Sequence, residues 1–127
     1  MNWFEADQYC KGLGGNLASF GTNESFNKVS IGQNLSNAGY RIFWIGLNSI
    51  NNGSYEWSDG SLANFTNWDY EQPDNYRDAE KCTEINSDGF WSDANCYIGS
   101  RGWVCKIRKD LTPTVALVNV NQTFPGT

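Results

Sequence analysis

The placement of four cysteines constrains the fold of this 127-residue chain more than any other feature. No two of them form a Cys-x-x-Cys pair, which argues against a four-sulfur zinc site. In a short extracellular chain, four cysteines predict two disulfides, and spacing alone leaves three connectivities open. The cysteines are Cys10, Cys82, Cys96 and Cys105. An extracellular location is also favoured by five Asn-x-Ser/Thr glycosylation signals, at Asn23, Asn34, Asn52, Asn64 and Asn121.

The negative charge of the chain is concentrated in one segment. The net charge is -5, whereas residues 69–93 contain eight acidic and two basic side chains and carry -6. Such a segment is either a solvated acidic face or a cation site. An acidic chain disfavours a nucleic-acid partner. No apolar stretch of the sequence approaches the roughly 20 residues of a membrane helix, so we expect no membrane insertion within these 127 residues. Because histidine is absent, Ser-His-Asp catalysis and His-ligated zinc are excluded.

Two helices are predicted near the N-terminus. Asn2 and Glu5 have the spacing of a capping box, and apolar residues then recur at three- and four-residue intervals as far as Leu13. This pattern predicts a helix that ends at Gly14-Gly15. A second helix is expected to begin near Thr22 or Asn23.

The remainder of the chain is typical of short strands. Runs rich in β-branched and aromatic residues are separated by Gly, Asn, Asp and Ser clusters. The predicted strands cover residues 43–47, 55–57, 81–85, 89–92 and 103–107. Residues 59–79 fit neither helix nor strand, and a long irregular stretch inside a compact domain is usually functional. Helices followed by small antiparallel sheets indicate a single domain of the α+β class.

Nine short motifs follow one another in a fixed order along the chain. They are Trp3-x-x-Ala6-x-x-x-Cys10, Gly15-x-Leu17-Ala18, Trp44-Ile45-Gly46-Leu47, Trp57-Ser58-Asp59-Gly60, Trp68, Gln72-Pro73-Asp74, Cys82, Trp91-Ser92-Asp93-x-x-Cys96 and Gly102-Trp103-Val104-Cys105. In this combination the chain resembles a C-type lectin-like domain over about residues 3–107. The resemblance implies disulfides Cys10–Cys105 and Cys82–Cys96. It also implies that the long irregular stretch is the loop that forms a calcium and sugar site.

The resemblance further implies a set of calcium ligands, which are Gln72, Asp74, Glu80, Ser92 and Asp93. Calcium takes six to eight oxygen ligands, and these residue types supply them. All of them except Ser92 would also hydrogen-bond the sugar. A cis Gln72–Pro73 bond is implied as well, and the Gln-Pro-Asp order is associated with galactose and N-acetylgalactosamine. Tyr76 is either an aromatic platform for the apolar face of such a sugar or an ordinary half-exposed loop residue.

Three departures from the family pattern bear on this expectation. Ser92 replaces an expected Asn, and its hydroxyl is a weaker calcium ligand than an amide carbonyl. Arg77-Asp78-Ala79 replaces the glycine-rich stretch of galactose-type members. An auxiliary calcium site is expected to be lost, because lysine and uncharged residues stand where acids are typical; these are Asn48, Ser49, Asn51, Asn52 and Lys81. The alternative hypothesis is therefore a lectin-like domain that binds a protein or glycoprotein ligand, with calcium absent or only structural.

Asp and Glu pairs can hydrolyse glycosides, but their better-matched role here is metal binding, so an enzyme is not expected.

We predict that residues 1–109 form the domain and that residues 110–127 form a linker or C-terminal tail. The family normally begins with a strand before the first helix, and we expect that strand to be missing here, because the sequence begins at the predicted helix. Residues 114–121 have β propensity. They either lead toward a following domain, as in tandem receptors similar to the mannose receptor family, or cover the sheet edge left bare. The predicted setting is a secreted protein or the ectodomain of a cell-surface receptor.

Overall fold

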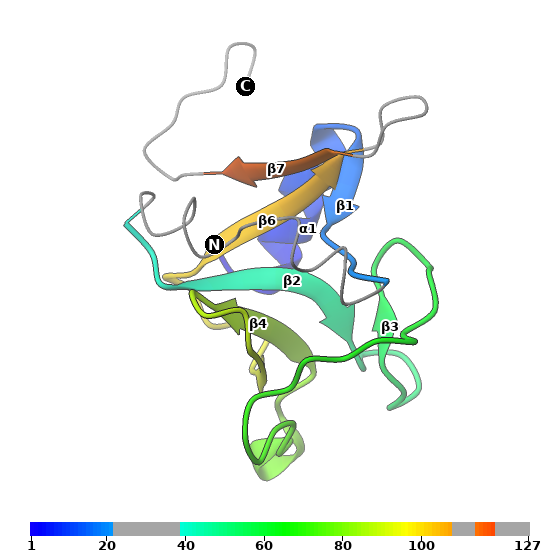
Figure 1. Ribbon diagram of the computed structural model, residues 1–127, viewed down its shortest axis with the longest axis vertical. Helices are drawn as coiled ribbons and strands as arrows, with labels where there is room; N and C mark the ends of the chain where they lie inside the picture. Colours follow the sequence, from blue (N-terminus) through cyan, green and yellow to red (C-terminus); the bar gives the residue numbers. More distant parts are fainter. Residues whose placement is uncertain (22–38, 108–113, 119–127) are drawn as a thin grey trace.

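The computed structural model of the chain describes residues 1–21, 39–107 and 114–118 (Figure 1). Its elements are α1 (Trp3–Gly12), β1 (Gly15–Leu17), β2 (Ile42–Asn48), β3 (Glu56–Trp57), the 3-10 turn η1 (Tyr76–Asp78), β4 (Cys82–Asn86), β5 (Trp91–Ala94), β6 (Gly102–Ile107) and β7 (Thr114–Val118). The α+β class is confirmed. The second predicted helix and the glycosylation signals at Asn23, Asn34 and Asn121 lie outside the described residues.

Helix α1 begins at the predicted position because its capping box forms. The side chain of Asn2 accepts a hydrogen bond from the backbone N–H of Glu5, and the Glu5 carboxylate accepts one from the backbone N–H of Asn2, each at 2.9 Å. One face of the helix buries Trp3, Ala6 and Cys10 against the sheet. This packing brings Cys10 next to Cys105 of β6.

The strands join in one sheet with the order β1-β6-β2-β4-β5, in which β3 also pairs with β2 and β7 also pairs with β6. All pairs are antiparallel except β2 and β6, which run parallel where Phe43 and Trp44 face Gly102 and Trp103. This pair corrects one detail of the prediction, in which the sheets are small and antiparallel throughout. The relative direction of β2 and β6 depends on the long connection between them, which local residue patterns do not encode.

Strand β1 is not predicted by the sequence pattern, because Gly14-Gly15 is also the signal of a helix end. Gly14 has a φ of 91°, which fits that role. Gly15 pairs with Ile107 of β6, and a Cβ at Gly15 would collide with the backbone of Lys106. The second glycine therefore serves the close approach of two strands rather than the helix end.

Strand β7 lies along β6, in a register that pairs Trp103 with Val118 at one end and Ile107 with Thr114 at the other. This pairing supports the interpretation in which the tail covers an edge of the sheet, while the boundary after residue 109 stays a prediction. Among the described residues, no helix has the length and apolar character needed to cross a membrane.

Tryptophan side chains build much of the core. The five that are at most 5% exposed are Trp3, Trp44, Trp57, Trp91 and Trp103, and the sixth, Trp68, packs against them partly buried. The Trp91 ring meets the rings of Trp57 and Trp68 edge-on, with centroids 5.5 and 5.8 Å apart. Because Trp91 begins β5, this packing fixes the strand that also carries Asp93.

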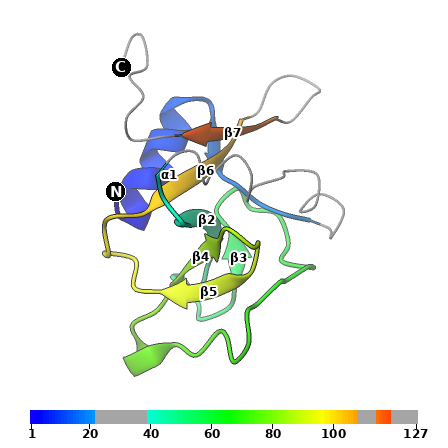
Figure 2. The same ribbon diagram turned by 60° about the vertical axis from the view of Figure 1, so that its left-hand side comes forward.

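Both implied disulfides are present. Cys10–Cys105 joins α1 to β6, and Cys82–Cys96 joins the first residue of β4 to the segment after β5. Figures 1 and 2 show the loop with η1 at the end of the molecule remote from α1 and β7. Cys82 closely follows η1 in the sequence, so the short disulfide ties β4, at the base of that loop, to the segment just beyond β5.

Candidate metal and ligand site

Three carboxylates meet where the η1 loop returns to the sheet. Asp74 precedes η1, Glu80 precedes β4, and Asp93 lies on β5; one carboxylate oxygen from each lies within 4.8 Å of the other two. Thr83 pairs with Asp93 across the β4–β5 ladder, so the sheet sets the separation of the last two acids. The structure thus brings together the three acidic residues that the sequence singles out.

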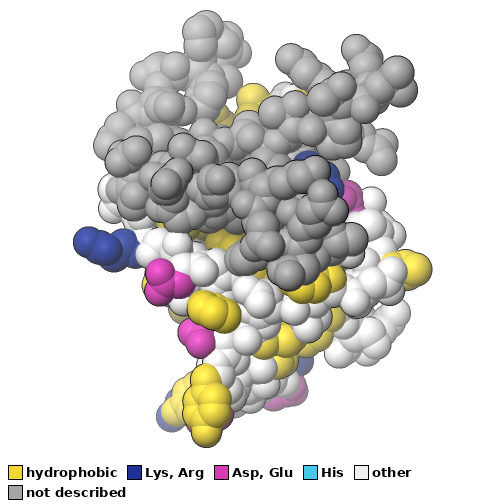
Figure 3. All heavy atoms as spheres, in the orientation of Figure 1, with side chains coloured by type: hydrophobic (Ala, Val, Ile, Leu, Met, Phe, Trp, Pro, Cys, Tyr) yellow, Lys and Arg dark blue, Asp and Glu magenta, His cyan; other side chains and the backbone are white. Residues whose placement is uncertain are grey.

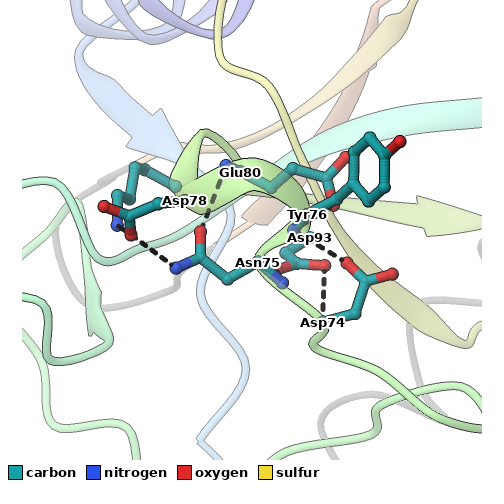
Figure 4. Close-up of polar contacts among 7 residues, drawn as sticks. Asp74, Asn75, Tyr76, Asp78, Glu80 and Asp93 are labelled. Atoms are coloured by element: carbon teal, nitrogen blue, oxygen red, sulfur yellow. Dashed lines mark hydrogen bonds and ion pairs between the residues drawn. The ribbon is translucent and has the colours of Figure 1, made fainter.

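Backbone amides of the loop hold these like charges together (Figure 4). The N–H groups of Asp74 and Asn75 donate to the two carboxylate oxygens of Asp93, at 3.1 and 2.6 Å. The N–H of Tyr76 donates to Asp74 at 3.2 Å and to Glu80 at 3.4 Å. Three successive amides therefore face the three carboxylates, an arrangement that suits bound negative charge.

Burial and the closeness of the acids together shift their pKa values. Burial, a hydrogen bond with Asp74 and the charge of Asp93 raise the pKa of Glu80 to about 7. Burial, opposed by the amide hydrogen bonds, also raises the pKa of Asp93, whereas the hydrogen bond from Glu80 lowers the pKa of Asp74. Without a cation, the site is therefore inclined to keep a proton on Glu80 near neutral pH.

Gln72 adds an oxygen donor beside the acids. Its side chain hydrogen-bonds Asp74 and contributes to lowering the pKa of Asp74. The Gln72 Oε1 is buried and has no hydrogen-bond partner, and an unpaired buried oxygen is unfavourable. The Gln72–Pro73 bond is cis, as the resemblance implies. Three carboxylates and one unpaired amide oxygen are the hard oxygen donors that Ca²⁺ prefers, so the residues present fit this ion.

Ser92 and Tyr76 are the two predicted site residues outside this carboxylate and amide set. Ser92 precedes Asp93 on β5 and faces Glu84 across the ladder, so its role as a ligand stays a prediction. The Tyr76 side chain is 59% exposed, and the Arg77 guanidinium lies 5.2 Å from the centre of its ring. Figure 3 shows hydrophobic and basic side chains together at the tip of the molecule that carries η1. An aromatic face is present at the site, but a sugar would share it with Arg77.

The polar residues that the sequence analysis assigns to a lost auxiliary site make other contacts. Asn48 donates to backbone oxygens of Gly46 and Glu56, and Lys81 forms an ion pair with Asp78 at 2.9 Å. In the described part of the chain, the Asp74–Glu80–Asp93 group is the only cluster of three potential metal-binding side chains of the Asp, Glu, Cys and His types. These contacts are consistent with a single ion site.

Two residues near the site were not predicted. Asn75 forms hydrogen bonds within the loop and to β5. Its sequence signal is its position directly after Gln-Pro-Asp, because asparagine tolerates a left-handed backbone there. Tyr55 has its pKa raised to about 12, chiefly by burial and then by the charges of Asp93, Glu80 and Asp74. No local signal connects Tyr55 to acids at least 19 residues farther along the chain.

Comparison with known proteins places the chain in a family. The model of the lectin C-type domain family matches residues 1–107. Asialoglycoprotein receptor 2 of Rattus norvegicus is 36% identical over 119 residues, which cover 88% of this chain and 37% of the receptor. The galactose-specific lectin nattectin of Thalassophryne nattereri is 36% identical over 107 residues, which cover 83% of this chain and 67% of nattectin.

A solved structure gives the same fold. The cow C-type carbohydrate-recognition domain of CD23, determined in the presence of a GlcNAc2Man3 oligosaccharide, superposes with a TM-score of 0.72 at 27% identity, over 94% of this chain and 82% of that one. The chain spans little more than a third of the length of asialoglycoprotein receptor 2. The family match over nearly the whole described chain, together with the disulfides and the fold, shows that the protein belongs to the C-type lectin domain family.

Proposed function

We propose that the domain binds carbohydrate through a calcium ion held by Gln72, Asp74, Glu80 and Asp93. The observation that carries this proposal is the convergence of three carboxylates within 4.8 Å, next to an unpaired amide oxygen. As a C-type lectin domain, the chain is a binding module and not an enzyme. When bound, Ca²⁺ would supply a Lewis-acidic centre that accepts sugar hydroxyl oxygens and neutralises the clustered acids.

The residues of the site would recognise the hydroxyls at the same time. Asp74 is exposed and Glu80 half-buried, so their oxygens are accessible as acceptors, while buried Asp93 is occupied by the amides of the loop. A charged acceptor makes a stronger hydrogen bond to a hydroxyl than a neutral one does. We therefore assign sugar contact chiefly to Asp74, Glu80 and the amide of Gln72, whereas Asp93 would ligate the calcium ion and hold the amides of the loop.

Within this function, galactose and N-acetylgalactosamine are the proposed sugars. The Gln-Pro-Asp order and the exposed ring of Tyr76 favour them, as does similarity to a lectin named galactose-specific. Glycans of glycoproteins are the corresponding partners. An extracellular setting accords with the two disulfides and with exposed glycosylation signals at Asn52 and Asn64.

Calcium removal gives the direct test of the function. We expect the domain to be retained on immobilised galactose or N-acetylgalactosamine in millimolar Ca²⁺ and to elute with EDTA, because the acids alone repel one another and offer the sugar no cation. Binding to a mannose resin serves as the selectivity control. Retention that persists in EDTA would contradict a calcium-dependent site.

The pKa of Glu80 predicts how calcium binding depends on pH. Because Ca²⁺ needs the ionised carboxylate, each ion bound below about pH 7 must displace a proton from Glu80. The calcium Kd is then expected to rise by up to about tenfold per pH unit as the pH falls from 7 toward 5. Calorimetry in two buffers of different ionisation enthalpy would reveal the released proton. A Kd that is flat over this range would contradict the release of a proton from Glu80 on calcium binding.

A second candidate function is the binding of a protein ligand without calcium. Lys81, which immediately follows Glu80, and Ser92 in place of an amide ligand favour it. Titration with Ca²⁺ separates the two candidates, since heat of binding at millimolar calcium is expected only for the first.

A further inference from the structure

Asn75 joins the three parts of the site through three different groups. Its backbone N–H donates to Asp93 on β5 at 2.6 Å, and its side-chain Nδ2 donates to Asp78 in η1 at 2.8 Å. Its side-chain Oδ1 accepts the backbone N–H of Glu80 at 3.2 Å. Figure 4 shows Asn75 between Asp78, Glu80 and Asp93. A single loop residue thus connects the acid on β5, the acid before β4 and the turn between them.

The backbone conformation of Asn75 makes this arrangement possible. Its φ and ψ are 44° and 48°, in the left-handed region that most side chains avoid and that asparagine tolerates. A left-handed residue in such a run allows successive N–H groups to converge on one side, as the amides of Asp74, Asn75 and Tyr76 do. The side-chain bonds of Asn75 then lock the turn in this conformation.

Lys81 anchors the outer end of the network. The Oδ1 of Asp78 accepts hydrogen bonds from both Asn75 Nδ2 and Lys81 Nζ, at 2.8 and 2.9 Å. The ammonium thus compensates an acid that would otherwise add to the repulsion near the cluster. The contacts run from Lys81 through Asp78 and Asn75 to Asp93, and so connect the beginning of β4 with β5 through the loop.

We propose that Asn75 is a positioning residue that holds the carboxylate cluster in place before any ion binds. It contacts no ion or sugar itself; it fixes the direction of the amides that restrain Asp93, Asp74 and Glu80. The inference rests on the proposed function, in that its main readout is calcium affinity. Its second readout is the exchange of the amides in EDTA, which does not depend on calcium.

Asn75→Gly is the decisive variant, because glycine keeps the left-handed backbone and removes only the side-chain bonds. We expect the calcium Kd, measured by calorimetry, to rise about tenfold, since residues that orient ligands typically contribute 10- to 100-fold to metal affinity. In EDTA, the amides of residues 74–76 should exchange with solvent faster than in the unaltered protein. Asn75→Ala should bind calcium more weakly still, because alanine also resists the left-handed conformation.

Asn86→Ala is the matched control. Like Asn75, Asn86 makes two side-chain hydrogen bonds, but it accepts both, from the backbone N–H groups of Asp88 and Phe90 in the β4–β5 turn. We expect Asn86→Ala to lower the unfolding temperature without altering calcium affinity, whereas Asn75→Gly should alter calcium affinity with little change in unfolding temperature.

Asp78→Ala provides a second test, because 84% of the Asp78 side chain is exposed and folding is not at risk. It should weaken calcium binding by about threefold, whereas Asp88→Ala, with the same change in charge, should not.

The outcomes separate the two proposals. If the unaltered protein does not bind calcium but Asn75→Gly accelerates exchange at residues 74–76, the proposed function fails and the positioning role stands. If the unaltered protein binds calcium and Asn75→Gly binds it equally well with unchanged exchange, the positioning role is overturned and the function stands.

Discussion

Asp93→Asn is expected to weaken calcium binding by about 100-fold or more, through loss of ligand charge and loss of preorganisation together. Asp93 is 4% exposed, and its two carboxylate oxygens accept the N–H groups of Asp74 and Asn75. Asparagine has nearly the same shape, but one of its two terminal atoms is a donor. That NH₂ group would face a backbone N–H, so one of the two loop contacts becomes repulsive.

Calorimetric titration with Ca²⁺ measures this effect, and retention on a galactose resin reports its consequence for sugar binding. Asp69→Asn is the matched control, because Asp69 belongs to the same acidic segment and its carboxylate accepts only the neighbouring Tyr70 N–H among the described contacts. This control should bind calcium nearly as the unaltered domain does. Equal affinities for Asp93→Asn and the unaltered protein would remove Asp93 from the site.

Most of the fold could be predicted because its elements carry local signals. The capping box at Asn2 and Glu5 determines where α1 begins, and the apolar runs correspond to β2 through β6. The signals were insufficient where one residue type serves two purposes. Gly15 looks like the end of a helix, yet it allows β1 to approach Lys106 closely. The parallel pairing of β2 with β6 also has no local signal, since it depends on a connection of more than 50 residues.

The candidate site, like the fold, has one part that could be predicted from the sequence and one that could not. Asp74, Glu80 and Asp93 could be singled out from the family motifs and the charge of their segment, and the structure brings them together. What holds them together could not be predicted, because it consists of backbone N–H groups whose directions depend on the φ and ψ of the loop. The contributions of Asn75 and Tyr76 follow from these directions, and any residue other than proline has the N–H that Tyr76 uses. Charge patterns thus identify candidate ligands, whereas their preorganisation has to be seen in three dimensions.

The two disulfides are expected to have separable effects when each is removed by a pair of Cys→Ala substitutions. Cys10–Cys105 closes a loop with a sequence separation of 95, and Cys82–Cys96 one with a separation of 14. In the loop-entropy model their removal costs about 5 and about 3 kcal/mol. Small domains are stable by roughly 5–15 kcal/mol, so loss of the long bridge should leave a large unfolded fraction at 37 °C.

The short bridge should matter more for binding than for folding. It ties the start of β4, two residues after Glu80, to the segment just beyond β5, which carries Asp93. A domain without it should still unfold cooperatively in urea at a lower midpoint, yet bind calcium about tenfold more weakly, because its ligands are no longer confined. Urea titration and calorimetry on both pairs of variants make the comparison. If loss of Cys82–Cys96 leaves calcium affinity unchanged, the β4–β5 ladder alone fixes the two acids, and the bridge contributes only to stability.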